Sequence, residues 1–132
     1  MNREGPMMTI QTKRVYDPVD QGDGTRVLVD RVWPRGMTKE KLKADLWLKD
    51  AAPSAVLRKW FSHDPGRWEA FKERYFAELD GNQQATNQLF GLLEKGTVTL
   101  LFSARDTLHN QAIALKEYLI LMHKHTKNRK KS

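Results

Sequence analysis

The chain reads RVLVDRV over residues 26–32, and this stretch decides the fold class. Its apolar centre, residues 27–29, contains no polar gap, which is typical of a strand covered on both faces. Residues 97–102, which read TVTLLF, predict a second strand of the same kind. A long segment with helical signals joins the two, so the connection is long enough for them to run parallel.

A weaker alternation at residues 9–15 predicts an earlier strand. Turn-forming residues, Asp17-Pro18 and the glycines of Gln21-Gly22-Asp23-Gly24, separate it from residues 26–32. This connection is too short for a crossover helix. The first two strands are therefore either an antiparallel pair or not neighbours.

Capping residues mark the helices between and after the strands. The expected starts and ends are a short helix after Thr38, a helix after Pro53-Ser54, a helix from Asp64-Pro65 to Gly81, a helix from a cap at Asn82 to Gly96, and a last helix that starts near Asp106. Helical spacing places Val56 and Leu108 on buried faces. Residues 45–48 fit either a helix end or a short strand.

These elements predict one α/β domain with a small mixed or mostly parallel sheet of three to four strands covered by helices. A chain of 132 residues has room for one such core. We expect a flexible leader at residues 1–8, the domain at residues 9–122 and a flexible basic tail at residues 123–132.

Composition excludes several classes of protein. The chain has no cysteine, so disulfide scaffolds, thiolate zinc sites and cysteine nucleophiles are excluded. No apolar run approaches the roughly 20 residues that cross a bilayer, and the first residues lack a secretory signal. We expect a cytoplasmic protein that does not enter membranes. Glycine-rich phosphate loops and dinucleotide fingerprints are also missing, and the histidines do not stand at paired metal-ligand spacing, so we expect no cofactor and no metal.

The formal net charge of +7 is unevenly distributed. Residues 123–132 contain Lys124, Lys127, Arg129, Lys130 and Lys131 and no acid, so they supply +5 and leave +2 for the rest of the chain. Such a segment can bind nucleic acid weakly and without sequence preference. The alternative is a segment that only improves solubility.

The first group of candidate site residues follows residues 26–32, where ligands of parallel sheets bind beyond the strand ends. Arg31 and Arg35 can bind phosphate or carboxylate in bidentate fashion, Trp33 can stack on a planar group, and Asp30 can orient a proton carrier. The alternative is an internal network in which Asp30 holds Arg31 and Trp33 fills the end of the sheet.

A second group follows residues 97–102. Ser103, Arg105 and Asn110 lie near the expected start of the last helix, which favours anions. His109 is a candidate proton carrier with Asp106 to orient it. In the alternative interpretation Asp106 only caps the helix and His109 is merely hydrogen-bonded.

A third group lies at residues 61–68. His63 is a second candidate proton carrier and Arg67 a further anion ligand. The same residues also fit a helix start, in which Asp64 caps, Pro65 opens the turn and Trp68 anchors the helix.

Taken together, these groups resemble the YeaO-like family of bacterial domains of unknown function. The resemblance rests on six blocks and covers roughly residues 10–121; the blocks are residues 13–17, 23–36, 47–54, 57–61, 63–68 and 99–110. It implies a small cytoplasmic α/β domain with no established reaction. It also singles out polar positions that here are Asp30, Arg31, Arg35, His63, Asp64, Arg67, Arg105, Asp106, His109 and Asn110.

The leading hypothesis is a protein that binds or acts on a small anionic ligand, phosphate-bearing or nucleotide-like, at the carboxyl ends of the strands. Whether it is an enzyme is left open, as is the oligomeric state. The alternative is a nucleic-acid-associated or regulatory module that uses the basic tail.

Overall fold

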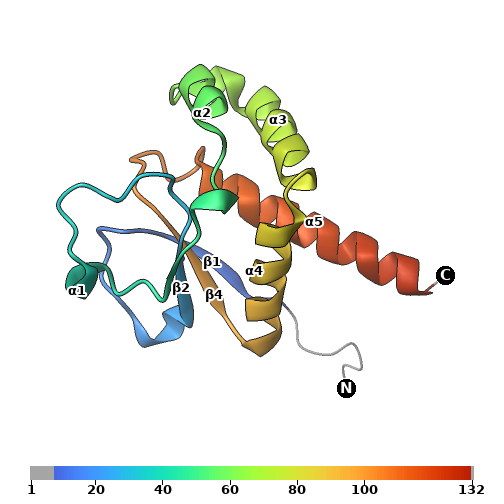
Figure 1. Ribbon diagram of the computed structural model, residues 1–132, viewed down its shortest axis with the longest axis horizontal. Coiled ribbons are helices and arrows are strands. Elements are labelled where there is room, and N and C mark those ends of the chain that lie inside the picture. Colours follow the sequence, from blue (N-terminus) through green and yellow to red (C-terminus); the bar gives the residue numbers. More distant parts are fainter. Residues whose placement is uncertain (1–7, 132) are drawn as a thin grey trace.

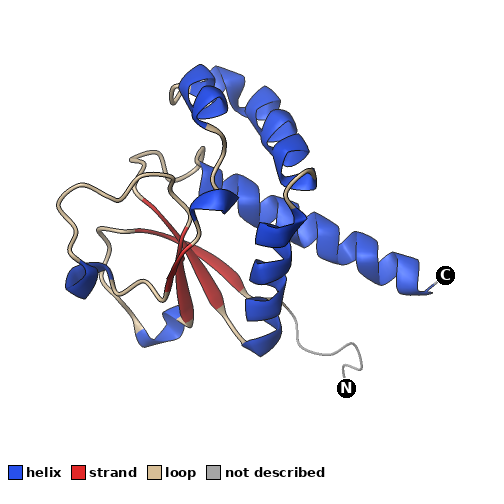
Figure 2. Ribbon diagram, viewed as in Figure 1, coloured by secondary structure: helices blue, strands red, loops and turns tan. Residues whose placement is uncertain are grey.

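The protein is built on a four-stranded parallel sheet, seen in the computed structural model, which describes residues 8–131 (Figures 1 and 2). The strands are β1 (Ile10–Arg14), β2 (Thr25–Leu28), β3 (Leu46–Trp47) and β4 (Val98–Phe102). Their order across the sheet is β1-β4-β2-β3, and every pair is parallel. The α/β class and the small, mostly parallel sheet are therefore confirmed.

Strand β4 lies between the two strands that precede it in sequence. Val98 is in register with Ile10 on one side and with Thr25 on the other. The sequence left open whether the first two strands form an antiparallel pair or are not neighbours. The structure shows that they are not neighbours. The residues that fit a helix end or a strand form β3, which pairs with β2.

Strand β2 is shorter than predicted. It ends at Leu28 rather than at Val32, although the Val29 amide still donates to the Leu101 carbonyl. One residue later the Asp30 carboxylate accepts the Ser103 amide at 3.0 Å. The Ser103 amide thus bonds to the side chain of Asp30 and not to its backbone carbonyl, and the chain leaves the sheet at Asp30.

The helices occupy the predicted segments with one clear exception. They are α1 (Lys39–Leu42), α2 (Ala55–Phe61), α3 (Trp68–Asp80), α4 (Gln83–Lys95) and α5 (Gln111–Lys131). The predicted start of the last helix at Asp106 is wrong, because Asn110 caps it: its Oδ1 accepts the Ile113 amide at 3.0 Å. Asp106 caps only the turn before it.

The caps of the other helices agree with the sequence except at Asn82. Thr38, Ser54 and Asp64 each accept a backbone amide of the turn that follows. Asn82 precedes α4 but donates its side chain to the Asp50 carbonyl at 2.7 Å instead of capping. It therefore ties the α3–α4 turn to the loop before α2.

The main core contains residues of the sheet and of helices α2, α3, α4 and α5, of which Figure 1 shows α4 and α5 beside the strands. Alternate strand residues such as Val27, Leu100 and Phe102 enter it. The predicted burial of Val56 and Leu108 is wrong, since they are 81% and 70% exposed. Val56 lies on the outer side of α2, and Leu108 precedes α5 rather than belonging to it.

A smaller core lies on the opposite face of the sheet. Val15, Leu28, Leu42 and Leu101 are buried there, with Trp33 and Trp47 packed against them. Helix α1 and its flanking loops cover this face (Figure 1).

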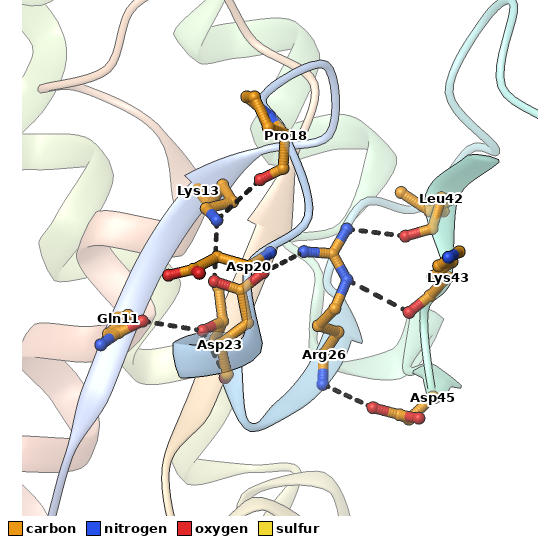
Figure 3. A network of polar contacts seen from close by, with 10 residues as sticks. Gln11, Lys13, Pro18, Asp20, Asp23, Arg26, Leu42, Lys43 and Asp45 are labelled. Atoms are coloured by element: carbon orange, nitrogen blue, oxygen red, sulfur yellow. Dashed lines mark hydrogen bonds and ion pairs between the residues drawn. The ribbon is translucent and has the colours of Figure 1, made fainter.

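The same face carries a polar network toward the amino ends of the strands (Figure 3). Asp23 accepts Lys13 Nζ at 2.7 Å and Arg26 Nη1 at 2.5 Å. Arg26 also donates to the Leu42 and Lys43 carbonyls, which fixes the end of α1. We call Lys13, Asp23 and Arg26 the Asp23 network; it was not predicted from the sequence.

The structure describes part of each of the two predicted terminal segments. The leader falls outside the described residues except for Met8, which packs against the main core. Helix α5 continues to Lys131, so most of the segment expected as a flexible tail is helical. In the part of the chain that the structure describes, no helix combines the length and the apolar character needed to cross a membrane.

Candidate functional site

A cleft of about 830 Å³ opens at the carboxyl ends of β2 and β4. The loops after these strands line it together with α2, which Figure 1 shows at that end of the sheet. The cleft brings together ten of the eleven predicted site residues: Asp30, Arg31, Trp33, Arg35, His63, Ser103, Arg105, Asp106, His109 and Asn110. Segments that are distant in sequence thus meet where the sheet topology predicts.

Arg67 is the predicted residue that does not join the cleft. Its guanidinium lies over the Trp60 ring, donates to the Trp60 carbonyl and is 3.6 Å from the Asp64 carboxylate. The structural interpretation of this segment as a helix start is confirmed for Asp64, whose Oδ1 accepts the Gly66 amide at 2.9 Å.

The cleft is strongly basic. Five cationic side chains line it: Arg31, Arg35, Arg58, Lys59 and Arg105. Among the residues whose side chains are described, none of the five forms an ion pair. All but Arg31 are exposed to solvent.

Arg31 is held in place by the backbone. Its Nε donates to the Pro53 carbonyl at 3.1 Å and one terminal nitrogen donates to the Ala52 carbonyl at 3.3 Å. Asp30 does not hold it, in contrast to the internal network considered from the sequence. Two neutral acceptors orient this guanidinium and leave its charge uncompensated.

Asp30 forms the junction of three elements at the cleft. Its carboxylate accepts the Ser103 amide and the side chain of Gln111, and its carbonyl accepts the Trp47 indole at 2.8 Å. Burial raises the pKa of Asp30, although the hydrogen bonds from Ser103 and Gln111 and the charge of Arg58 oppose that shift. Asp30 is 7% exposed, so its main role here is to join the ends of β2 and β4 to the start of α5.

Asp106 and His109 form a hydrogen-bonded pair at the cleft. Asp106 Oδ2 is 2.9 Å from His109 Nδ1, and Oδ1 accepts the Leu108 and His109 amides. The Leu108 amide first, and the His109 ring next, lower the pKa of Asp106, so this carboxylate stays ionised. It fixes the Nδ1 proton of His109 and leaves Nε2 as the ring atom without an assigned partner.

A pair of carboxylate and imidazole at this distance is suited to proton transfer or to binding an anion when the imidazole is protonated. The His109 ring also meets the edge of Trp68, with centroids 5.3 Å apart. Within the described side chains no group of three His, Asp or Glu residues converges as metal ligands would.

His63 reaches the cleft from the end of α2 with an unusual backbone. Ser62 and His63 have φ values of 47° and 57°, in the left-handed region that costs non-glycine residues energy. Both residues line the cleft. The turn after α2 therefore keeps a strained conformation at the position where it presents an imidazole.

Two predicted ligand residues are fixed by internal contacts. The Trp33 indole donates to the Met37 carbonyl and packs against the Trp47 ring at 5.3 Å. Asn110 is 2% exposed, its Nδ2 donates to the Asp106 carbonyl, and its Oδ1 accepts the Ile113 amide. These contacts assign Asn110 to the frame of the site.

Five polar residues of the lining were not predicted as site residues from the sequence: Tyr16, Arg58, Lys59, Ser62 and Gln111. Tyr16 is 45% exposed and donates its hydroxyl to the Arg35 carbonyl, so it supports the loop that carries Arg35. Arg58 and Lys59 occupy the polar side of an expected helix, where exposed cations are ordinary. Their spacing in the sequence does not distinguish them from other exposed helix cations. Only the position of α2 in the fold identifies them as cleft residues.

Comparisons with known proteins agree with the sequence resemblance. The family described as "Inactive DUF488-N3 subclade" matches residues 9–132. The uncharacterized protein YeaO of Escherichia coli strain K12 is 46% identical over 112 residues, which is 85% of this chain and 97% of YeaO. Uncharacterized proteins of Mycobacterium bovis and of Mycobacterium tuberculosis strain H37Rv are each 38% identical over 110 residues, 83% of this chain and 92% of theirs. No solved structure shows significant similarity to the chain. The chain therefore belongs to the DUF488-N3i family and is a YeaO-like domain.

Proposed function

We propose that the cleft at the carboxyl ends of β2 and β4 binds a small anionic ligand, most simply one that bears phosphate. The observation that carries this proposal is the group of five cationic side chains that share the cleft without an ion pair among the described side chains. Like charges gathered in a hollow raise the local concentration of anions and become stabilised when an anion binds.

The two carboxylates of the cleft, Asp30 and Asp106, do not form ion pairs with the five cations. Asp30 is occupied by Ser103 and Gln111, and Asp106 by the turn that contains His109. An anion from outside is therefore the partner that the five cations lack. Arginine suits this task because its planar fork matches phosphate and carboxylate oxygens.

The description of the matching family as inactive favours binding without turnover. The Asp106–His109 pair then serves to add a hydrogen-bond donor, and in its protonated form a charge, to the binding site. Binding without chemistry is thus our proposal for this chain.

The test is anion binding by the Arg35→Ala and Arg105→Ala variants, with inorganic phosphate as the first probe and isothermal titration calorimetry as the measurement. Each variant should lose about tenfold in affinity, because a hydrogen bond to a charged group contributes about 1.5 kcal/mol or more. Arg74→Ala is the matched control, since Arg74 lies over the Trp60 ring outside the cleft.

Two results would contradict the proposal. One is a screen of inorganic and organic anions in which none binds. The other is a loss of several degrees of melting temperature in both variants without an effect on anions, which would make these arginines part of the scaffold.

A second candidate is nonspecific binding of nucleic acid by residues 123–132. The observation in its favour is that α5 continues to Lys131 through a segment with five basic and no acidic residues. A salt titration of DNA binding with and without residues 124–132 tests it. Binding that disappears with the segment is charge attraction alone, whereas sequence preference that survives its removal would require a different surface.

A further inference from the structure

We infer that the ligand carries two anionic groups, and that Arg58 and Lys59 of α2 form a second anion subsite; this rests on the proposed function of the cleft. The cations reach the cleft from two directions. The loops after β2 and β4 supply Arg31, Arg35 and Arg105, which we call the sheet-side cations, and α2 supplies Arg58 and Lys59, the helix-side cations.

The first argument is the charge of the cleft. Its lining holds five cations and two carboxylates, Asp30 and Asp106, so the balance is +3 with both histidines neutral. One phosphate monoester brings a charge between about −1.5 and −2 at neutral pH. A single group of this kind leaves the cleft positive, whereas a ligand with two such groups compensates it.

The second argument is size. A cleft of about 830 Å³ is near the upper end of the range of roughly 300–1,000 Å³ for small-molecule sites, well beyond what one phosphate fills. Apolar side chains, among them Phe61 and Phe71, line it together with the cations. An uncharged linker between two anionic groups fits such a mixture of surfaces.

The third argument is the direction of the helix-side cations. Neighbouring residues of an α-helix project about 100° apart. Arg58 and Lys59 are neighbours, and both line the cleft. The helix-side cations therefore reach the cleft from α2, a different element from the loops that carry the sheet-side cations.

Local chemistry on the α2 side supports a subsite there. Ser62 and His63 follow α2 and also line the cleft. A hydroxyl and an imidazole thus accompany the two cations, and no carboxylate from α2 or its following turn lines the cleft. The charge of Arg58 reaches Asp30, yet that carboxylate already accepts hydrogen bonds from Ser103 and Gln111.

The experiment compares inorganic phosphate with alkane bisphosphonates whose chains have two to six carbons, by isothermal titration calorimetry. For the wild type we expect at least one bisphosphonate to bind ten times more tightly than phosphate. In the double variant Arg58→Ala, Lys59→Ala this advantage should disappear, because the affinity for bisphosphonate should fall much more than the affinity for phosphate. Arg105→Ala should weaken both probes.

The matched control is the double variant Arg74→Ala, Lys95→Ala, which removes one arginine and one lysine outside the cleft and should keep the advantage. Arg58 and Lys59 are exposed, so their replacement should leave the fold intact, and circular dichroism with urea unfolding checks this.

Each other outcome has a definite meaning. If no bisphosphonate binds more tightly than phosphate, or if the Arg58 and Lys59 variant loses phosphate and bisphosphonate equally, the second subsite is refuted and the anion site remains. If neither probe binds, or if Arg105→Ala changes nothing, both this inference and the proposed function fail.

Discussion

The Asp23 network and the basic cleft lie at opposite ends of the same sheet and use the same residue types differently. In the network the Asp23 and Arg26 side chains are 3% and 5% exposed, and the guanidinium has a carboxylate and two carbonyls as partners. In the cleft most cations are exposed and none has a carboxylate partner among the described side chains. A buried arginine whose guanidinium is fully hydrogen-bonded stabilises the fold, whereas an exposed arginine without an ion-pair partner is available to a ligand.

The carboxylates show the same contrast. Burial alone would raise the pKa of Asp23, but hydrogen bonds from Lys13, the Asp20 amide and Arg26 lower it. Asp30 is also buried, and there burial prevails and the pKa is raised, because its close partners are neutral and Arg58 acts on it only through its charge. Hence both cations of the network share a carboxylate partner, whereas the cations of the cleft have none among the described side chains.

The largest effect that separates the two regions is expected for Arg26→Ala. Removing this guanidinium leaves Asp23 with only Lys13 and the Asp20 amide, and it leaves the Leu42 and Lys43 carbonyls without their donor. The free energy of unfolding should fall by about 3–5 kcal/mol, as it does when one partner of a buried ion pair is lost. Urea unfolding measures it.

Arg35→Ala in the cleft is the matched substitution and should change the free energy of unfolding by less than about 0.5 kcal/mol. Similar losses of unfolding free energy in Arg26→Ala and Arg35→Ala would contradict the division into a structural Asp23 network and a ligand-binding cleft.

A smaller effect of opposite sign is expected for His63→Gly. The φ of His63 is 57°, so glycine relieves a left-handed backbone and should stabilise the protein by about 1 kcal/mol. The same change removes an imidazole from the cleft and should weaken phosphate binding. Thermal unfolding and calorimetry test the two parts separately.

Lys43→Gly is the control for His63→Gly, because Lys43 has a φ of 51° and lies beside the Asp23 network. It should stabilise to a similar degree and leave anion binding unchanged. A loss of binding in both glycine variants would mean that the cleft depends on overall rigidity and not on the imidazole.

The smallest effect is expected for Asp106→Asn. Asparagine can still accept the Leu108 and His109 amides, so mainly the charge beside His109 is lost. Because the pKa of Asp106 is lowered by folding, its carboxylate stabilises the protein above about pH 4, and this contribution is lost as the pH falls through the lowered value.

The melting temperatures of wild type and Asp106→Asn, measured from pH 7 down to pH 2, should therefore differ slightly at pH 7 and converge in acid. A difference that grows as the pH falls would have the wrong sign for this assignment.

The comparison also explains what the sequence could predict. Buried strands such as residues 98–102 and caps such as Ser54 depend on neighbouring residues, and they lie where the patterns place them. The meeting of Asp30, Arg105 and His109 followed from the rule that parallel strands end at one edge of the sheet. Asp106 and Asn110 are four residues apart and both are residue types that cap helices, so the sequence pattern did not show that α5 begins after Asn110.

The features that the sequence did not predict depend on long-range packing. Arg26 looked like the start of a strand, and only the position of α1 gives its guanidinium two carbonyls to bind. Arg58 and Lys59 looked like ordinary surface residues of an amphipathic helix until the fold set α2 beside the strand ends.

The position of β4 has a consequence for synthesis on the ribosome. Strands β1 and β2 each pair with β4, although more than sixty residues separate β2 from it along the chain. A nascent chain that has not yet reached Val98 leaves both strands with open backbone edges on the sides that β4 later covers, and such edges attract other chains. The sheet is completed only when residues 98–102 have left the ribosome, so chaperone contact or aggregation is expected before that moment and not after it.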